Sequence, residues 1–278
     1  MNKLYLNRKL SEGYPGLDKL ALETFTNLLE EGGDRNSLLE AYLSCFARLV
    51  ELREYKNVLV LGCGPKPQTV QFLISKGYNV VGIEPVPLFV QAAREYLGSQ
   101  DNILEGAAES ISLPDNSQNI ILCEGVLEHV DSPTKSLNEI FRVLAPGGIV
   151  YIATTNRYRF SLRGYNGEFK INYFNWFPDI LKECFVFQHM HYEPSLANYS
   201  LRPAVHWYSY ADLCKLGRQT GFAHFYSLLD LLEPDDPFVA KSKVRQFLLN
   251  KLKFNPWLRA LALRQIGSTI IMLKRNSP

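Results

Sequence analysis

The stretch Val58-Leu59-Val60-Leu61-Gly62-Cys63-Gly64 decides the fold of this chain. Its apolar run ends in two glycines, and a helical pattern begins a few residues later, at about residue 67. A second apolar run, over residues 80–83, ends in Glu84. Strand, glycine turn, helix, strand and carboxylate in this order are typical of a Rossmann-like nucleotide-binding unit. In such a unit, glycines let the backbone approach the ligand, and the carboxylate accepts hydrogen bonds from ribose hydroxyls.

Further blocks follow in order along the chain. They are Gly106-Ala107-Ala108-Glu109, Leu113-Pro114-Asp115-Asn116-Ser117, Val126-Leu127-Glu128-His129-Val130 and Val143-Leu144-Ala145-Pro146-Gly147-Gly148. Together with the glycine turn and Glu84, these blocks closely resemble the class I S-adenosylmethionine (SAM) dependent methyltransferases, in particular the small-molecule branch that includes the quinone-biosynthesis enzymes (methyltransferase type 11). A lone Gly-x-Gly pair is weak as a signal, whereas the ordered set is specific. The resemblance covers roughly the middle third of the chain.

Composition favours an ordinary globular protein of the cytoplasm. The 278 residues are 46% hydrophobic and 21% charged, with a net charge of +2 that gives no electrostatic footprint for nucleic acid. The first nine residues lack the apolar stretch of a signal peptide, and no run is long and apolar enough to span a bilayer. The cysteines, 5 in number, are dispersed and show no zinc spacing, which suggests reduced thiols. We expect a monomer or homodimer with a small-molecule acceptor as partner.

The fold class expected is α/β, a Rossmann-like, doubly wound, mostly parallel sheet. Strands are predicted near 57–62, 79–84, 102–106, 118–124 and 148–155, and helices near 67–77, 87–97, 133–144 and 210–220. Asp131 or Ser132 should cap the helix that begins at Pro133, and Gly221 should end the helix at 210–220. Residues 222–232 and 268–274 are the predicted final strands. The resemblance implies seven strands, with an antiparallel final strand and with the last two strands forming an antiparallel pair at one sheet edge.

We divide the chain, as one domain over 1–278, into a helical cap (1–54), a SAM-binding core (55–157), an aromatic-rich insert (158–208) and a C-terminal part (209–278). The cap contains helical patterns at 17–29 and 37–53. The aromatic insert follows the fifth strand, where α/β proteins place ligands, so it is either the wall of a substrate pocket or a small satellite core. Both interpretations stay open.

A second, helical insert at 233–265 separates the final two strands. Val244, Phe247, Leu248 and Leu252 fall on one helical face, with lysines and arginines mostly elsewhere. A basic amphipathic helix with a nearby tryptophan is typical of a membrane surface. A surface helix packed on its own domain, or on a second subunit, is the favoured interpretation.

The resemblance implies a SAM site built from residues at the strand ends. These are Leu61, Gly62, Cys63, Gly64, Gln68, Glu84, Pro85, Ala108, Glu109, Glu124 and Gly125. Glu84 should bind the ribose diol. Ala108 and Glu109 should meet the adenine, through a backbone amide and a side chain respectively. Gln68 is a candidate contact to the methionine carboxylate.

Three positions depart from the family pattern. Val60 stands where an acidic residue is usual, Lys66 where a third glycine is usual, and Ala107 where an aspartate is frequent. These departures motivate an alternative, a methyltransferase-like protein that binds SAM without catalysis. They also count against an NAD-dependent oxidoreductase, because the pyrophosphate turn uses the third glycine for helix packing.

His129 is the favoured catalytic base, because it follows the fourth strand and imidazole suits proton removal near neutral pH. The alternative is that His129 packs the loop and positions Glu124. His206 is a second candidate base, and Tyr14, Asn156, Trp207 and Tyr208 are candidate substrate contacts. Some quinone O-methyltransferases bind a metal through a cluster whose first glutamate is replaced here by Gly125, so no metal site is predicted.

The other histidines should be structural. His224 is expected in a buried strand. His189 and His191 are two apart, a spacing that metal ligands can have, but with no third ligand fixed by the sequence, polar or aromatic packing is favoured. The predicted function is transfer of a methyl group from SAM to a small organic acceptor, with a hydroxyl on a hydrophobic or aromatic metabolite preferred. N- or C-methylation and a membrane-associated lipid methyltransferase are the alternatives within the enzyme class.

Overall fold

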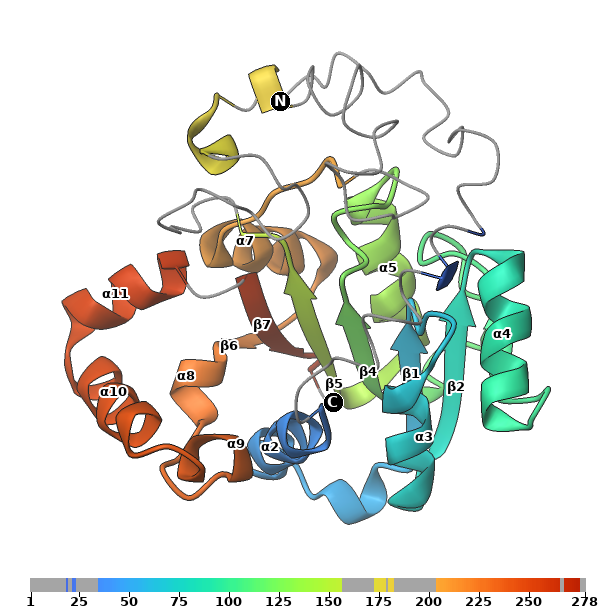
Figure 1. Ribbon diagram of the computed structural model, residues 1–278, viewed down its shortest axis with the longest axis horizontal. Helices are drawn as coiled ribbons and strands as arrows, with labels where there is room; N and C mark the ends of the chain where they lie inside the picture. The colour runs from blue at the N-terminus through green and yellow to red at the C-terminus, as the bar shows by residue number, and fades with distance from the viewer. Residues whose placement is uncertain are drawn as a thin grey trace.

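A seven-stranded sheet forms the centre of the computed structural model, which describes residues 19, 22–23, 35–156, 173–178, 180–182, 204–265 and 268–275 (Figure 1). The strand order is β3-β2-β1-β4-β5-β7-β6. The strands are β1 (Asn57–Leu61), β2 (Asn79–Glu84), β3 (Ile103–Glu105), β4 (Gln118–Glu124), β5 (Leu144–Thr154), β6 (His224–Tyr226) and β7 (Ser268–Leu273). Strands β1 to β5 are parallel, and β7 is antiparallel to both β5 and β6. The predicted fold class is confirmed, including the antiparallel final strand.

The order of the strands determines where a ligand can bind. Strand β1 lies between β2 and β4, so the chain order reverses at β1. In an open α/β sheet, the crevice at such a switch point lies beyond the carboxyl ends of the strands. The residues after Leu61, Glu84 and Glu124 therefore meet at one edge.

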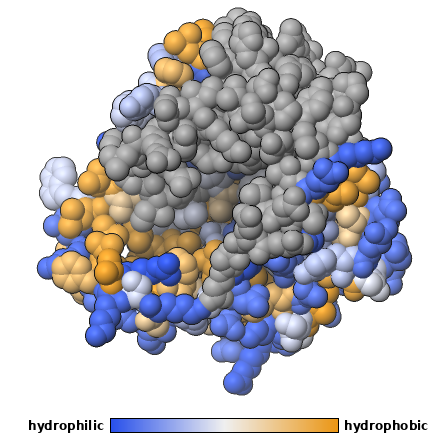
Figure 2. Space-filling view, viewed as in Figure 1, coloured by the Kyte–Doolittle hydropathy of each residue, from blue (hydrophilic) through white to orange (hydrophobic). Residues whose placement is uncertain are grey.

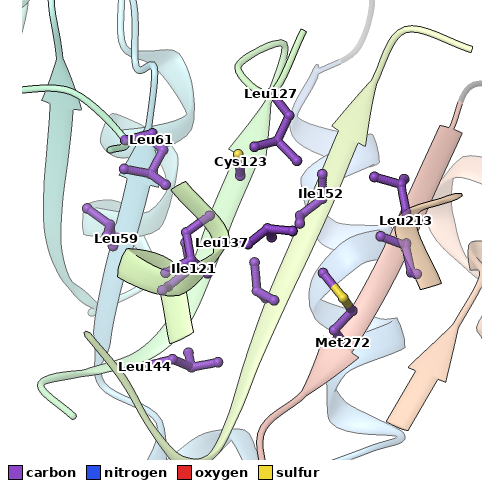
Figure 3. Packing of buried hydrophobic residues seen from close by; sticks show 14 of the residues in the cluster. Leu59, Leu61, Ile121, Cys123, Leu127, Leu137, Leu144, Ile152, Leu213 and Met272 are labelled. Atoms are coloured by element: carbon purple, nitrogen blue, oxygen red, sulfur yellow. The ribbon is translucent and has the colours of Figure 1, made fainter. Parts of the chain in front are cut away.

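Helices cover both faces of the sheet because its central strands are buried on both sides. Alternate residues of β1 and β4 belong to two separate apolar clusters. One cluster joins the sheet to α5 (Pro133–Val143) and α7 (Tyr210–Thr220). Figure 3 shows part of it, with Leu137 of α5 directed at Ile121 and Leu59 of the sheet. The other cluster joins the sheet to α2 (Arg35–Ala47), α3 (Gln68–Ser75) and α4 (Pro87–Leu97).

The predicted helix ends are confirmed at two sites. Ser132 caps α5, with its side chain accepting a hydrogen bond from the Lys135 amide, and Pro133 occupies the first turn. Helix α7 ends at Gly221, whose φ of 114° is the left-handed conformation that favours glycine.

Two predicted boundaries are wrong. The helix predicted at 37–53 begins earlier and ends at Ala47, and only a short 3-10 turn, η1 (Leu52–Glu54), follows. The strand predicted at 222–232 is confined to β6, because Ser227 and Asp230 form a capping box that begins helix α8 (Leu228–Leu231). His224 is exposed at the start of β6, which corrects the prediction that it is buried.

Three helices connect α8 to β7. They are α9 (Pro237–Ala240), α10 (Lys243–Phe254) and α11 (Pro256–Gln265). Their small core consists of Leu229, Val239, Leu249 and Ala262. An apolar cavity of about 270 Å³ opens beside this core, between α8, α9, α10 and β7.

The helical face predicted for α10 differs from the one observed. The helix packs on its own domain through Leu249, with Leu252 partly buried beside it. Val244, Phe247 and Leu248 are between 50% and 66% exposed, so they do not form the packed face.

Several predicted features lie outside the described residues. These are Tyr14, nearly all of the helical pattern at 17–29, and most of the aromatic insert, including His189 and His191. Within the insert the structure describes η2 (Phe174–Trp176) and a few flanking residues, and the chain is described again from residue 204.

Candidate functional site

The glycine turn after β1 brings bare backbone to the carboxyl edge of the sheet. Gly62 and Gly64 have φ values of 65° and 68°, a left-handed conformation in which a side chain is strained. A Cβ at Gly62 would stand 2.5 Å from Val126 Cγ2, whereas a Cβ at Gly64 would meet no atom within 4 Å. Gly62 is thus required by packing, and Gly64 borders open space where a ligand can lie against the backbone.

Glu84 ends β2 next to this turn and is 5% exposed. Its Oε2 accepts a hydrogen bond from the Gly64 amide at 3.0 Å, and its Oε1 accepts one from the Val86 amide at 3.2 Å. Burial raises the pKa of Glu84 to about 7, against the opposing effect of the two amides. Each carboxylate oxygen retains lone-pair capacity, so the ionised group can accept both hydroxyls of a ribose diol.

Cys63 lies between the two glycines, and its thiol is partly buried. Burial, with Glu84 nearby, raises the pKa of Cys63 well above its ordinary value. The neutral thiol that results is a poor nucleophile, so the turn contributes shape and amides instead of thiolate chemistry.

Glu124, at the end of β4, belongs to a polar network that the sequence did not predict. Arg35 of α2 forms an ion pair with Glu124 and donates to Thr69 Oγ1 at 3.0 Å. The Tyr42 hydroxyl donates to Glu124 Oε1 at 3.2 Å, and the Tyr151 hydroxyl donates to Tyr42 at 3.0 Å. A cation and an anion therefore lie side by side beyond the glycine turn. Glu124 points to the face of the sheet that α2 covers.

The adenine-side residues lie beyond β3. Ala108 is buried in a turn in which the Ser110 amide donates to Ala107 O at 3.1 Å. Glu109 Oε1 accepts a hydrogen bond from the Asp131 amide at 2.8 Å. The Glu109 side chain thus fastens this turn to the loop after β4, and its predicted contact to adenine stays a prediction.

The loop after β4 is paired with the last residues of the aromatic insert. Both the Val205 amide, at 2.8 Å, and the His206 amide, at 3.3 Å, donate to Glu128 O. The His206 ring is buried, and its Nε2 lies 2.8 Å from Val130 O. Because a carbonyl oxygen only accepts, Nε2 carries the proton, and Nδ1 is the atom through which His206 would act as a base.

The two histidines predicted as bases therefore belong to adjacent segments. His129 is partly buried in the turn after β4, with its amide donating to Val126 O at 2.9 Å. The buried Glu128 beside it accepts a hydrogen bond from the Thr154 hydroxyl at 2.7 Å, which ties the loop to the end of β5.

Three of the predicted substrate contacts, Asn156, Trp207 and Tyr208, lie next to this loop. Trp207 and Tyr208 are buried, and a bridge joins Tyr208 to Asn156 beyond β5. The Phe174 ring, from the insert, lies 6.3 Å from the Trp207 ring. Asn156 is 1% exposed, and its side-chain amide donates to Arg264 O of α11 at 3.0 Å. Asn156 thus fixes the end of α11 to the end of β5.

The structure brings most predicted site residues to one edge. Leu61, Pro85 and Gly125 follow or end β1, β2 and β4, and Gln68 begins α3 beside Thr69. Within the described part of the chain, no group of three His, Cys, Asp or Glu side chains is arranged to hold a metal ion. The helices of that part include none that is long and apolar enough to cross a bilayer.

Comparisons with known proteins agree with this geometry. A family model described as a methyltransferase domain matches residues 59–152. A ubiquinone biosynthesis O-methyltransferase of Nitrosospira multiformis is 26% identical over 55% of this chain and 67% of its own length. A sterol 24-C-methyltransferase of Pneumocystis carinii and a thiol S-methyltransferase of Rattus norvegicus are 30% and 31% identical, over 35% and 38% of this chain. The matches span only 27% and 46% of those two relatives.

Solved structures support the fold. A SAM-dependent methyltransferase of Archaeoglobus fulgidus superposes with a TM-score of 0.50 at 15% identity, over 90% of this chain and 98% of that one. Another, from Mesorhizobium loti, has a TM-score of 0.50 at 14% identity, over 84% and 98%. Residues 59–152 thus form a methyltransferase domain, and this match, together with the relatives and the fold, supports a class I SAM-dependent methyltransferase with SAM as its cofactor.

Proposed function

We propose that this enzyme transfers the methyl group of SAM to an oxygen of a small, hydrophobic or aromatic acceptor. The observation that supports this most directly is the pairing of the loop that carries His129 with the segment from His206 to Tyr208. That pairing joins candidate bases and buried rings at the sheet edge where the glycine turn and Glu84 lie. A positively charged sulfonium supplies the activated methyl group when the cofactor is bound.

On the donor side, the residues present match the parts of SAM. Glu84 accepts the ribose hydroxyls, and the bare backbone at Gly64 admits the chain that links ribose to sulfur. The methionine portion is a zwitterion, and the Arg35–Glu124 pair offers a cation for its carboxylate and an anion for its ammonium. Binding would exchange one ion pair for two complementary ones, so little net charge is buried.

On the acceptor side, Trp207, Tyr208 and Phe174 form an apolar wall, and His129 is proposed as the base. An oxygen nucleophile gains reactivity when a nearby imidazole removes its proton during displacement, typically by about 100-fold or more. The relatives named above act on oxygen, carbon and sulfur. Preference for oxygen rests on the histidines and on the ubiquinone relative.

Calorimetric titration with SAM and with S-adenosylhomocysteine tests the donor site. We expect micromolar binding that weakens at least about 100-fold in Glu84→Ala, because two charge-assisted hydrogen bonds are lost. Glu105→Ala is the matched control, since Glu105 pairs with Glu84 in the sheet register but is exposed. Equal loss in both variants, or none in Glu84→Ala, would overturn the donor-site assignment.

Turnover of His129→Ala tests the base. Once an acceptor is found by screening hydroxylated aromatic and isoprenoid compounds, we expect turnover to fall about 100-fold with SAM affinity nearly unchanged. A fully active variant would exclude His129. His206→Gln, whose longer amide keeps a hydrogen-bond donor near Val130 O, would then be tested in the same way.

A further inference from the structure

The segment 237–265, which forms α9, α10 and α11, has a charge unlike that of the rest of the chain. It contains seven Lys or Arg residues and no Asp or Glu. The remaining residues carry 23 Lys or Arg against all 28 Asp and Glu. The small net charge of the protein therefore conceals a strongly basic segment on an otherwise acidic molecule.

The same segment exposes large apolar side chains. Phe254, at the end of α10, is 85% exposed, and Trp257, at the start of α11, is 86% exposed. Five further residues on these two helices are between 41% and 66% exposed: Val244, Phe247, Leu248, Leu258 and Leu261. We call these seven residues the apolar ridge. In Figure 2, apolar and hydrophilic surface are intermixed at the side of the molecule where Figure 1 places α10 and α11.

The cations flank the ridge and are held in position. Lys251 lies 5.6 Å from the Phe247 ring centroid, and Arg245 lies 4.1 Å from that of Phe238. The acidic partners of Lys253 and Arg259 come from outside the segment, from Glu233 and Asp230. Long basic side chains beside exposed aromatic and aliphatic ones are the arrangement that an interfacial helix presents to lipid headgroups and acyl chains.

The charge pattern favours a lipid surface over a second copy of the chain. A symmetric dimer through the ridge would bring two segments of seven cations each, with no acidic residue in either, against one another. An anionic bilayer supplies both complements at once, phosphate for the cations and hydrocarbon for the ridge.

The ridge is also coupled to the acceptor side of the site. The carbonyl oxygen of Arg264, at the end of α11, accepts a hydrogen bond from Asn156, and Ser268 of β7 pairs with Thr154 of β5. From these contacts, we propose that α10 and α11 dock the protein on an anionic lipid surface. If the proposed function holds, docking presents the acceptor side to molecules that partition into lipid.

Co-sedimentation of the whole protein with vesicles tests this docking without any need for activity. The vesicles are phosphatidylcholine alone, or phosphatidylcholine with one quarter phosphatidylglycerol. We expect binding to the anionic vesicles, weakened by salt. Lys243→Glu with Lys251→Glu, and separately Phe254→Ser with Trp257→Ser, should each lower the partition coefficient about tenfold or more.

Matched controls use residues on other helices. Lys135→Glu with Lys215→Glu makes the same charge change on the exposed surface of α5 and α7, and Ile74→Ser with Tyr96→Ser removes exposed apolar groups from α3 and α4. Both controls should bind as the wild type does. The proposal is overturned if anionic vesicles do not bind, or if the ridge variants bind normally. It is also overturned if light scattering shows a lipid-free dimer that Phe254→Ser with Trp257→Ser abolishes.

Discussion

Two regions of the molecule differ in the kind of ligand that they suit. One is the carboxyl edge of the sheet with the glycine turn and Glu84, which we call the cofactor edge, and the other is the connection between β6 and β7. At the cofactor edge, side chains are absent where we expect the ligand to come close, and the buried carboxylate of Glu84 is expected to orient it. In the connection, α10 and α11 turn large apolar side chains outward over a core of a few residues. A small ligand is recognised by a cavity of matching shape and a few positioned hydrogen bonds. An extended surface is recognised by the charge and apolar character of many exposed residues. Short sequence motifs therefore indicate a small-ligand site, whereas the net charge and the exposed apolar residues of a segment indicate a docking surface.

Substitutions in the glycine turn should have the largest effects, and they test whether bare backbone at the cofactor edge is needed for packing or for ligand binding. We expect Gly62→Ala to lower the free energy of unfolding by about 3 kcal/mol, because left-handed strain adds to the clash with Val126. Gly64→Ala should cost only about 1 kcal/mol in stability, but its methyl group enters the ligand space and SAM affinity should fall. Urea unfolding and calorimetry measure the two effects. Equal destabilisation by both variants would contradict the distinction between packing and binding.

Breaking the ion pair between Arg48, which follows α2, and Asp236 of the β6–β7 connection should lower the free energy of unfolding without changing SAM binding. Arg48 donates two hydrogen bonds of 3.0 Å to Asp236, whose side chain is 1% exposed. Arg48→Ala leaves that buried carboxylate without its cation, and we expect a loss of about 2 kcal/mol, reduced by the partial exposure of Arg48. Arg53→Ala, on the exposed η1 turn, is the control. A double-mutant cycle with Asp236→Asn that shows strict additivity would mean that the pair does not couple.

Affinity for SAM should depend on pH through Glu84. Its pKa, raised by burial to about 7, keeps the carboxyl protonated in the free protein below that pH. The ionised form is the one that accepts both ribose hydroxyls, so binding should be roughly tenfold weaker at pH 6 than at pH 8. Stability should change in the opposite direction, since the raised pKa makes the folded state less stable as pH rises from about 4.5 through 7. Glu84→Gln should bind weakly at every pH, and a wild-type affinity independent of pH would refute the linkage.

The smallest effect is expected at the ridge. Trp257→Ser removes a side chain that is 86% exposed, and we expect stability to change by less than about 0.5 kcal/mol. Thermal unfolding in the absence of lipid measures this. A large loss would show that Trp257 is packed in solution and would remove the contrast between the two regions.

The spacing of the motifs predicted which residues lie together at the cofactor edge. These residues follow the strands directly, and parallel strands bring their carboxyl ends to the same edge of the sheet. Gly62, Glu84 and Ala108 lie where the pattern indicated. Arg35 was missed because its partner Glu124 is 89 residues away, and no local pattern marks a lone arginine in the first turn of a helix.

The β6–β7 region was less predictable for a different reason. The pattern of apolar and polar residues after Phe222 is compatible with either a strand or a short helix. The capping box of Ser227 and Asp230 was the feature that indicated the helix. The buried face of α10 turns on Leu249, one position from the exposed Leu248. Which of these two neighbouring leucines is buried depends on how α10 packs against α8 and α9, and a local sequence pattern does not contain this tertiary packing.

Strand β7 has a consequence for the synthesis of this protein. It is an inner strand, hydrogen-bonded to β5 on one side and β6 on the other, and its Ile270, Ile271 and Met272 are fully buried. A nascent chain that has not yet released residues 268–273 from the ribosome can pair β1 to β5, but the outer edge of β5 stays open. Such an edge is a template for misassociation, so chaperones should recognise the chain until β7 pairs with β5.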